Sequence, residues 1–334
     1  MQGADNGHVP DGTPRSRTRV DDRGRLAARP GEIPARGWKD VLARTAKQLK
    51  ADDVSTQSAA VAFYAVLALF PALLALVSLY GLAADPADVR SQLSSFLEAA
   101  PTDARRLVTD QLGAITRSAS GGLGVGVVVG IAVALWTASS GVKALIKGVN
   151  VAYGERETRT FVRLRGLALV LTVLGVVGVA VMLGLVVALP AVLDRVAGDA
   201  VRWVGLVLRW PLVALLIFAA LAVVYRYAPD RENPEWRWVS WGAVVAAALW
   251  LLASIGFSVY VSLLGSYNET YGSLGAIVVL LLWLYLSAFA ILVGAELNAE
   301  MERQTARDTT TGADRPMGER DAYAADTLGE QVGR

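Results

Sequence analysis

The sequence predicts an all-α, polytopic membrane protein with six transmembrane helices, and two observations carry this prediction. First, no Lys, Arg, Asp or Glu interrupts six long runs that together make up nearly half of the 334 residues. Second, most of these runs exceed the roughly 20 residues that a helix needs to cross a hydrocarbon core of about 30 Å. Because even the buried helices of soluble proteins keep one wet face, a soluble enzyme with a single core is excluded.

The predicted spans follow these runs closely. They cover residues 59–83, 121–142, 166–190, 204–226, 239–264 and 272–297. The uncharged run within the fourth span is short, but apolar residues from Val204 extend it, and Arg209 near its end can reach the headgroups. Strands of a membrane barrel would alternate polar and apolar residues over about 10 positions, and these runs do not.

Six spans place both termini on one side of the membrane, and the basic residues indicate which side. The segments on the side of the termini hold 25 Lys and Arg residues, against 7 in the opposite loops. Lys and Arg collect in cytoplasmic loops, so both termini are predicted to be cytoplasmic.

The two ends of the chain differ in composition from the membrane domain, which is predicted to cover residues 38–302. Residues 1–37 are rich in Gly, Pro, Arg and Asp, residues 303–334 are equally polar, and both are predicted to be disordered cytoplasmic tails. At the start of the domain, Trp38, Val41 and Leu49 share one face of an expected amphipathic helix, with Arg44 on its polar side.

The first outer loop is long and patterned. Two stretches within about 86–117 each begin with a proline and carry an apolar stripe at helical spacing, so we expect an amphipathic helical pair there. Such a pair either packs as a lid on the bundle or gates a cavity, and the sequence leaves both readings open.

Two features of the spans bear on packing. Small residues recur every fourth position in the second span, which lets two helix backbones approach closely; they are Gly122, Gly126, Gly130, Ala134 and Ala138. Pro71, in the middle of the first span, removes a backbone hydrogen bond and predicts a kink. Such interruptions mark substrate sites in some transporters and are plain kinks in other proteins.

The polar residues next to the predicted spans are the candidates for a cavity or gate. Most of them lie at the cytoplasmic ends of helices, and Tyr285 lies deeper in the last span: Gln57, Tyr64, Lys143, Asn150, Arg226, Tyr285, Glu296 and Asn298. Glu296 is the candidate for which the sequence gives the most specific alternatives. It is either part of a solvated helix end or a carboxylate that faces a cavity and pairs with Lys143, Lys147 or Arg226.

No residue pattern predicts catalysis, a metal site or a cofactor. Cysteine is absent and the single histidine, His8, lies in the polar arm, so thiol chemistry and a buried histidine base are excluded. Phosphate-binding loops, a serine nucleophile elbow and the zinc-protease helix are missing too, as are basic and aromatic residues in a nucleic-acid-binding array. We therefore predict a protein that is not an enzyme and whose partners are membrane lipids.

Four ordered blocks of the chain resemble the YihY/BrkB family of bacterial inner-membrane proteins. The blocks are 58–71, 148–154 with the basic residues up to Arg165, 225–230, and 271–298. The resemblance implies six transmembrane helices in the cytoplasmic membrane. It implies little chemistry, because the family has no settled activity; members have carried a ribonuclease BN label and are discussed as transporter-like proteins of the cell envelope.

Two functions follow as hypotheses. The first is a transporter or flippase-like protein for an amphiphilic or lipid-like envelope substrate, favoured by Pro71, the outer helical pair and the polar residues at the cytoplasmic mouth. The alternative is a non-catalytic scaffold for envelope assembly that binds envelope proteins. A membrane-embedded hydrolase or ribonuclease is disfavoured, since the carboxylate or histidine clusters that such a centre needs are not visible.

Overall fold

The computed structural model describes residues 21–83, 125–196, 198–263 and 267–331. Helices make up most of these residues, and no strand occurs among them beyond one isolated bridge between Pro234 and Thr310. The helices are α1 (Ala35–Ala51), α2 (Val54–Ala83), α5 (Val125–Ala152), α6 (Phe161–Leu183), α7 (Leu189–Val196), α8 (Asp199–Tyr227), α9 (Trp236–Leu263), α10 (Tyr267–Glu302) and α11 (Tyr323–Asp326), with short turns η1 (Pro30–Glu32) and η2 (Gly184–Ala188).

Four of the described helices are long and apolar enough to cross a membrane. They contain the stretches Phe161–Val186, Ala200–Tyr227, Trp236–Ser262 and Ile277–Glu302, and a shorter apolar stretch covers Val54–Ala68. The predicted first and second spans lie largely within α2 and α5. The total of six spans stays a prediction, and the helical pair expected at 86–117 lies outside the described residues.

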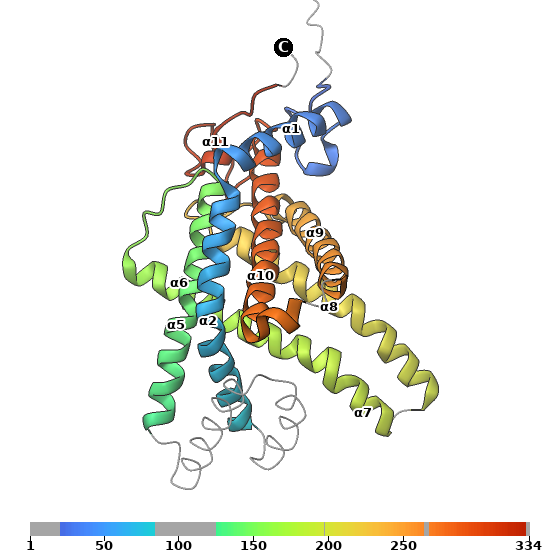
Figure 1. Cartoon of the computed structure of the whole chain (residues 1–334). Coiled ribbons are helices and arrows are strands. Elements are labelled where there is room, and N and C mark those ends of the chain that lie inside the picture. Colours follow the sequence, from blue (N-terminus) through green and yellow to red (C-terminus); the bar gives the residue numbers. More distant parts are fainter. Residues whose placement is uncertain (1–20, 84–124, 197, 264–266, 332–334) are drawn as a thin grey trace, which may run out of the picture.

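The bundle is built around α2, α5 and α10 (Figure 1). The most extensive helix contact joins α2 to α5, and α10 packs against both α9 and α2. The stretch 161–196, which runs through α6, η2 and α7, would measure about 54 Å if it were fully α-helical, well over the bilayer core. Figure 1 shows this stretch and α8 inclined away from the central helices, and such a tilt is one way in which a long helix fits the bilayer.

The widened helical turn between α6 and α7 has a local cause. Pro190 lacks the N–H that an α-helix would use at that position, and the preceding residues Gly184–Ala188 form a π-helical turn. The helix therefore continues in the same general direction with one widened turn.

Glycine allows α9 and α10 to approach closely. A Cβ atom on Gly294 would lie 2.6 Å from the Gly242 carbonyl oxygen and 2.8 Å from the Ala246 Cβ. The Tyr225 hydroxyl donates a hydrogen bond of 2.7 Å to the Ile291 carbonyl, which ties α8 to the same place. Any larger side chain at either glycine would push the two backbones apart.

Small residues of α5 lie at its contact with α2. Ala134 and Ala138 are buried, and a Cβ on Gly141 would lie 3.4 Å from the Tyr64 carbonyl oxygen. Of the predicted small-residue series, Gly122 is outside the described residues, and the surroundings of Gly126 and Gly130 are not described. Helix α2 continues through Pro71 as one element.

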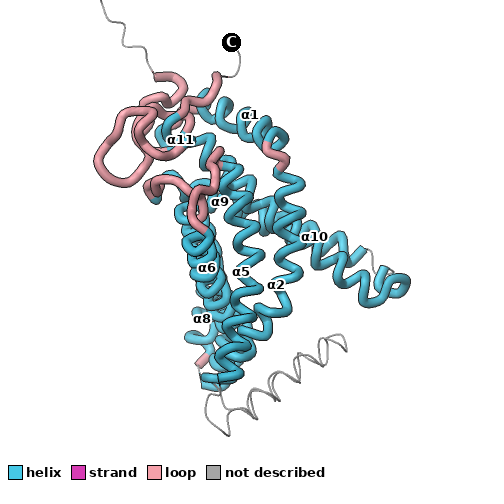
Figure 2. The backbone as a smooth tube through the Cα atoms, turned by 90° about the vertical axis from the view of Figure 1, so that its left-hand side faces the viewer, coloured by secondary structure: helices cyan, strands magenta, loops and turns pink. Residues whose placement is uncertain are grey.

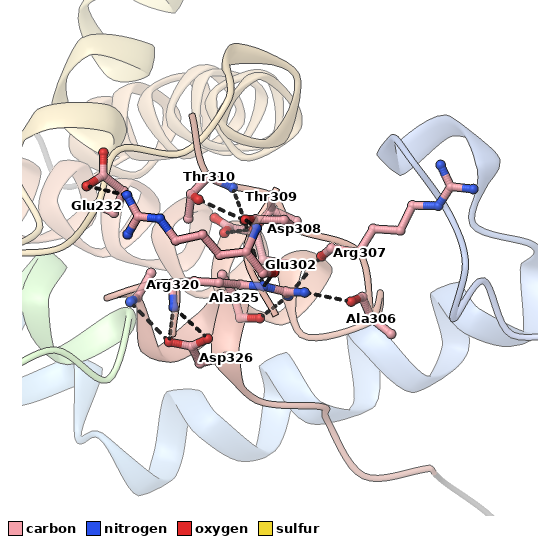
Figure 3. A network of polar contacts seen from close by, with 12 residues as sticks. Glu232, Glu302, Ala306, Arg307, Asp308, Thr309, Thr310, Arg320, Ala325 and Asp326 are labelled. Atoms are coloured by element: carbon pink, nitrogen blue, oxygen red, sulfur yellow. Dashed lines mark hydrogen bonds and ion pairs between the residues drawn. The ribbon is translucent and has the colours of Figure 1, made fainter. Parts of the chain in front are cut away.

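Both described ends of the chain lie at the same end of the bundle, where the loops also gather (Figures 1 and 2). We call the structure formed there by residues 21–34, 153–160, 228–235 and 303–331 the cap. Arg320 is the centre of its C-terminal part (Figure 3). It is 4% exposed, and its guanidinium donates to the carbonyls of Arg315, Arg307, Ala325 and Ala306 at 2.7–3.1 Å.

The cap differs from the disorder that composition predicted for residues 21–37 and 303–331. A polar segment lacks the apolar surface to fold alone, but a buried guanidinium with four carbonyl acceptors supplies a polar core. The N-terminal segment adds to it, since Arg25 donates to the carbonyls of Arg303 and Gly329. Residues 1–20 lie outside the described part of the chain.

Helix α1 also differs from its prediction in one respect. Val41 is buried as expected, but Arg44, placed by the sequence on the polar face, is turned inward and is only 7% exposed. The reason is its partner, because α1 packs against α10 and presents Arg44 to a buried glutamate there.

Candidate functional site

The end of α10 carries three buried carboxylates within two turns, and two of them have arginine partners. Glu300 is held by Arg44 of α1, whose Nε lies 2.5 Å from Oε2, and by Arg303, whose Nη1 lies 2.5 Å from Oε1. Arg44 also donates to the Glu300 carbonyl and to the Gln304 side chain, both at 2.9 Å. Glu300 therefore fastens α1 to α10.

Glu302 lies in a second pair, which joins α10 to the cap. Arg231 donates to its two oxygens at 3.2 and 2.7 Å, the side chains of both residues are fully buried, and the Thr309 hydroxyl donates at 2.7 Å. Burial alone would lower the pKa of Arg231, but the adjacent Glu302 charge outweighs burial and raises it. The buried charge of each residue is therefore balanced by the opposite charge of the other.

Glu296, one turn before Glu300, has neither an arginine nor any other donor. It is fully buried, and neither carboxylate oxygen has a hydrogen-bond partner among the described residues. The acidic group that acts on it most strongly is Asp52, at the junction of α1 and α2, whose carboxyl lies within hydrogen-bond reach when one of the two is protonated. The pairing with Lys143, Lys147 or Arg226 considered from the sequence is not formed, and both lysines are exposed.

Asn150 belongs to a separate network, which joins α5 to the cap. Its side chain donates to Glu157 at 2.9 Å and accepts from the backbone N–H of Asp230 at 2.8 Å. Asp230 in turn accepts from the hydroxyl and N–H of Thr158 at 2.7 and 2.6 Å. Burial would raise the pKa of Asp230, but these hydrogen bonds, with the nearby Arg159, outweigh it and hold the pKa below its usual value.

Asn298 faces α9. Its Oδ1 accepts from the Gly242 N–H at 2.8 Å, and its amide nitrogen donates to the Val239 carbonyl at 3.3 Å. These contacts stabilise the close approach of α9 and α10.

The other predicted residues are spread over the bundle. Arg226 donates to the Pro234 carbonyl and lies over the Trp236 ring at 4.6 Å. Tyr285 shares a hydrogen bond of 2.8 Å with Ser55 at the start of α2. Gln57 is half-buried and Tyr64 is 44% exposed. The predicted polar residues thus form several local contacts between helices.

An apolar cavity of about 410 Å³ lies between α2, α5, α6 and α10. Ala65 and Ala68 of α2, Gly141 of α5, Gly175 of α6 and Leu284 of α10 line it, and the wall is almost wholly apolar. Val179, also in the wall, is 49% exposed, so the cavity opens onto the outer surface of the bundle. The sequence did not predict it, because it depends on how the helices are rotated.

Asp52 is the functional candidate that sequence reasoning missed. The signal was the pair Asp52-Asp53 between an amphipathic helix and a span, where two acidic residues stand directly beside the bilayer. Among the described residues, no group of three or more His, Cys, Asp and Glu side chains is arranged to hold a metal ion.

Comparisons with known proteins agree on one family. A family model described as "Virulence factor BrkB" matches residues 45–318. The chain is 35% identical over 258 residues to the Bacillus subtilis protein named "Putative ribonuclease-like protein YfkH", covering 75% of this chain and 90% of that protein.

Two further relatives match over shorter stretches. A UPF0761 membrane protein of Idiomarina loihiensis is 31% identical over 110 residues, which is 33% of this chain and 38% of that protein. A UPF0761 membrane protein of Vibrio cholerae is 37% identical over 97 residues, 29% of this chain and 32% of that protein. No solved structure matches the chain.

Proposed function

The chain belongs to the Virulence factor BrkB family, and from that premise we propose that it is a flippase-like transporter of a lipid-like, amphiphilic envelope substrate. The relatives named as membrane proteins and the apolar helices support the membrane setting. The bacterial inner membrane and the cytoplasmic position of the cap are parts of the same proposal, and they rest on the distribution of basic residues.

The observation that carries the proposal is the apolar cavity. Its volume of about 410 Å³ lies within the range of roughly 300–1,000 Å³ typical of small-molecule sites. Residues 171–179 of α6 begin about 15 Å from the start of that helix, a depth within the hydrocarbon layer. An apolar site at that depth suits an acyl or similar hydrocarbon chain, while the headgroup of the same molecule would stay outside the cavity.

A wall residue offers a way to fill the cavity. A Cβ atom on Gly175 would meet nothing within 4 Å, so a leucine at this wall position displaces no neighbouring residue, and we expect it to reduce the space for a ligand. Gly166 of the same helix also has nothing within 4 Å, and it is not part of the wall. Gly175→Leu and Gly166→Leu therefore make the same chemical change inside and outside the site.

The test is lipid movement by the purified protein in liposomes that contain fluorescent phosphatidylglycerol or phosphatidylethanolamine. Dithionite added outside bleaches only the outer leaflet, so movement between leaflets accelerates the loss of the protected fraction. We expect the wild-type protein and Gly166→Leu to accelerate this loss, and Gly175→Leu to slow it severalfold. A photoreactive acyl chain should crosslink to α6 in the wild type and much less in Gly175→Leu.

Bleaching no faster than in protein-free liposomes, together with equal crosslinking in both variants, would overturn the proposal. The scaffold for envelope assembly would then be the remaining candidate. We also propose that the protein is not a ribonuclease, and we expect the same preparation to release no nucleotides from RNA in the presence of a divalent cation.

A further inference from the structure

The junction of α1 and α2 is a sharp elbow of two acidic residues. Helix α1 ends at Ala51, Asp52 caps it with its N–H bonded to the Gln48 carbonyl, and Asp53 has a positive φ of 46° before α2 begins. Asp53 is exposed, whereas Asp52 is half-buried and faces Glu296 of α10. The elbow therefore directs one carboxyl to water and the other into the bundle.

The charge of Glu296 is uncompensated in this position. A buried carboxylate without a donor or a cation is strongly unfavourable, and a second carboxylate beside it makes ionisation of both worse. The basic groups in the neighbourhood are engaged elsewhere, since Arg44 and Arg303 both bind Glu300. One proton shared between the two carboxyl groups removes the repulsion and supplies the missing hydrogen bond.

We propose that Glu296 and Asp52 form a proton-binding site that joins α10 to the elbow between α1 and α2. With the proton bound, one carboxyl donates to the other and the elbow is held against α10. When the proton leaves through half-buried Asp52 to the water at the cap, both groups are ionised and the elbow separates from α10. The site stands independently of lipid transport.

Other charged or titratable groups face this pair from several elements, and they limit what its ionisation can do. Glu300 and Arg303 lie on α10 itself, and Tyr153 at the end of α5 is buried within the electrostatic reach of Glu296. Arg44 approaches from α1 but is bound to Glu300. Because α1 stays fastened through Arg44, movement on proton loss is expected at the elbow and the start of α2.

The first experiment detects the proton directly by infrared spectroscopy of the full chain in lipid nanodiscs. We expect the C=O stretch of one protonated carboxyl at neutral pH, lost on raising the pH. Glu296→Gln should abolish that band, and so should Asp52→Asn, a second variant that changes the half-buried partner. Asp53→Asn is the matched control: the same change one residue away, on an exposed side chain, at a φ that asparagine adopts readily.

The second experiment measures the movement. The chain has no cysteine, so Thr56→Cys near the start of α2 and Lys143→Cys on α5, both at exposed positions, take up two spin labels without background. We expect the distance between the labels to change over the pH range in which the band disappears, and to do so in Asp53→Asn as well. Glu296→Gln, whose amide can still donate to Asp52, should stay in the low-pH form at every pH.

Three outcomes would overturn the proposal. A carboxyl band that survives in both Glu296→Gln and Asp52→Asn would assign the proton to another group. A pH-dependent change of distance that is unaltered in Glu296→Gln would separate the movement from the pair. A transition that follows sodium concentration at constant pH would make the ligand a metal cation. None of these results depends on whether lipids are moved.

Discussion

Two places on the last helix contain the same chemical group in opposite surroundings. Glu302 is fully buried and meets an arginine, a threonine hydroxyl and the cap, while Glu296, six residues earlier, is fully buried and meets only another carboxyl. Burial is therefore the same, and the partners differ. The first arrangement suits a fixed joint between α10 and the cap, and the second suits a group whose charge changes.

The difference predicts unequal consequences when each carboxylate or its partner is altered. A satisfied buried ion pair costs much when one partner is removed, because the other charge is left buried without compensation. Removing the charge of a buried carboxyl that already lacks a donor should cost the folded protein little stability. The following variants test this contrast in decreasing order of effect on stability.

Arg231→Met should have the largest effect, since it leaves Glu302 buried with only the Thr309 hydroxyl as a donor. We expect a loss of about 3–5 kcal/mol in the free energy of unfolding, measured by SDS-induced unfolding from mixed micelles. The double variant Arg231→Met with Glu302→Gln removes the stranded charge and should recover a large part of that loss. A double variant no more stable than Arg231→Met would show that the ion pair is not the cause.

Arg44→Met should have a smaller effect, because Arg303 still binds Glu300 from the other side. The loss of charge-assisted hydrogen bonds to Glu300 predicts a decrease of about 1.5–3 kcal/mol by the same measurement. Lys47→Met, one turn further along α1, is the control, because its side chain is 75% exposed. Protease cleavage should also become faster in the C-terminal tail of Arg44→Met, since Arg44 donates to the Glu330 carbonyl.

Asp230→Asn tests the network that joins α5 to the cap, and its pH dependence. The aspartate has a pKa below its usual 3.8 in the folded protein, so its contribution is complete above that value and is lost as the pH falls through the lowered folded pKa. We expect Asp230→Asn to lower the free energy of unfolding by about 1–2 kcal/mol at neutral pH. Its stability should then fall less steeply than that of the wild type in acid below about pH 4; an equally steep fall would assign the acid sensitivity to other carboxylates.

The contrast on α10 also shows which features of the structure could be predicted from the sequence. The uncharged runs predicted the positions of the long helices, since an apolar run that must cross lipid has few alternatives to a helix. They could not predict that Arg44 turns inward, because an arginine at this position of the helix is equally compatible with an exposed polar face. The same holds for Glu296: its spacing from Glu300 was visible, but only the rotation of α10 and the elbow at Asp52 decide that one carboxylate meets arginine and the other does not.

The ordered cap is the other part that composition did not predict. Residues 303–331 have few apolar side chains, yet Arg320 gathers four carbonyl groups from the segment around it. A polar core of this kind has no periodic signature in a sequence, because its acceptors are backbone atoms that every residue carries.

Glu296→Gln should have the smallest effect on stability, and this result would complete the contrast. The amide replaces a carboxyl that has no donor, keeps nearly its shape, and can itself donate to Asp52. We therefore expect the free energy of unfolding at neutral pH to change by less than about 1 kcal/mol, or to rise, because the amide N–H replaces the shared proton as the donor to Asp52 and no arginine partner is lost. A loss as large as that of Arg231→Met would mean that ionised Glu296 is stabilised by a partner as strong as an arginine, and the distinction between the two carboxylates would fail.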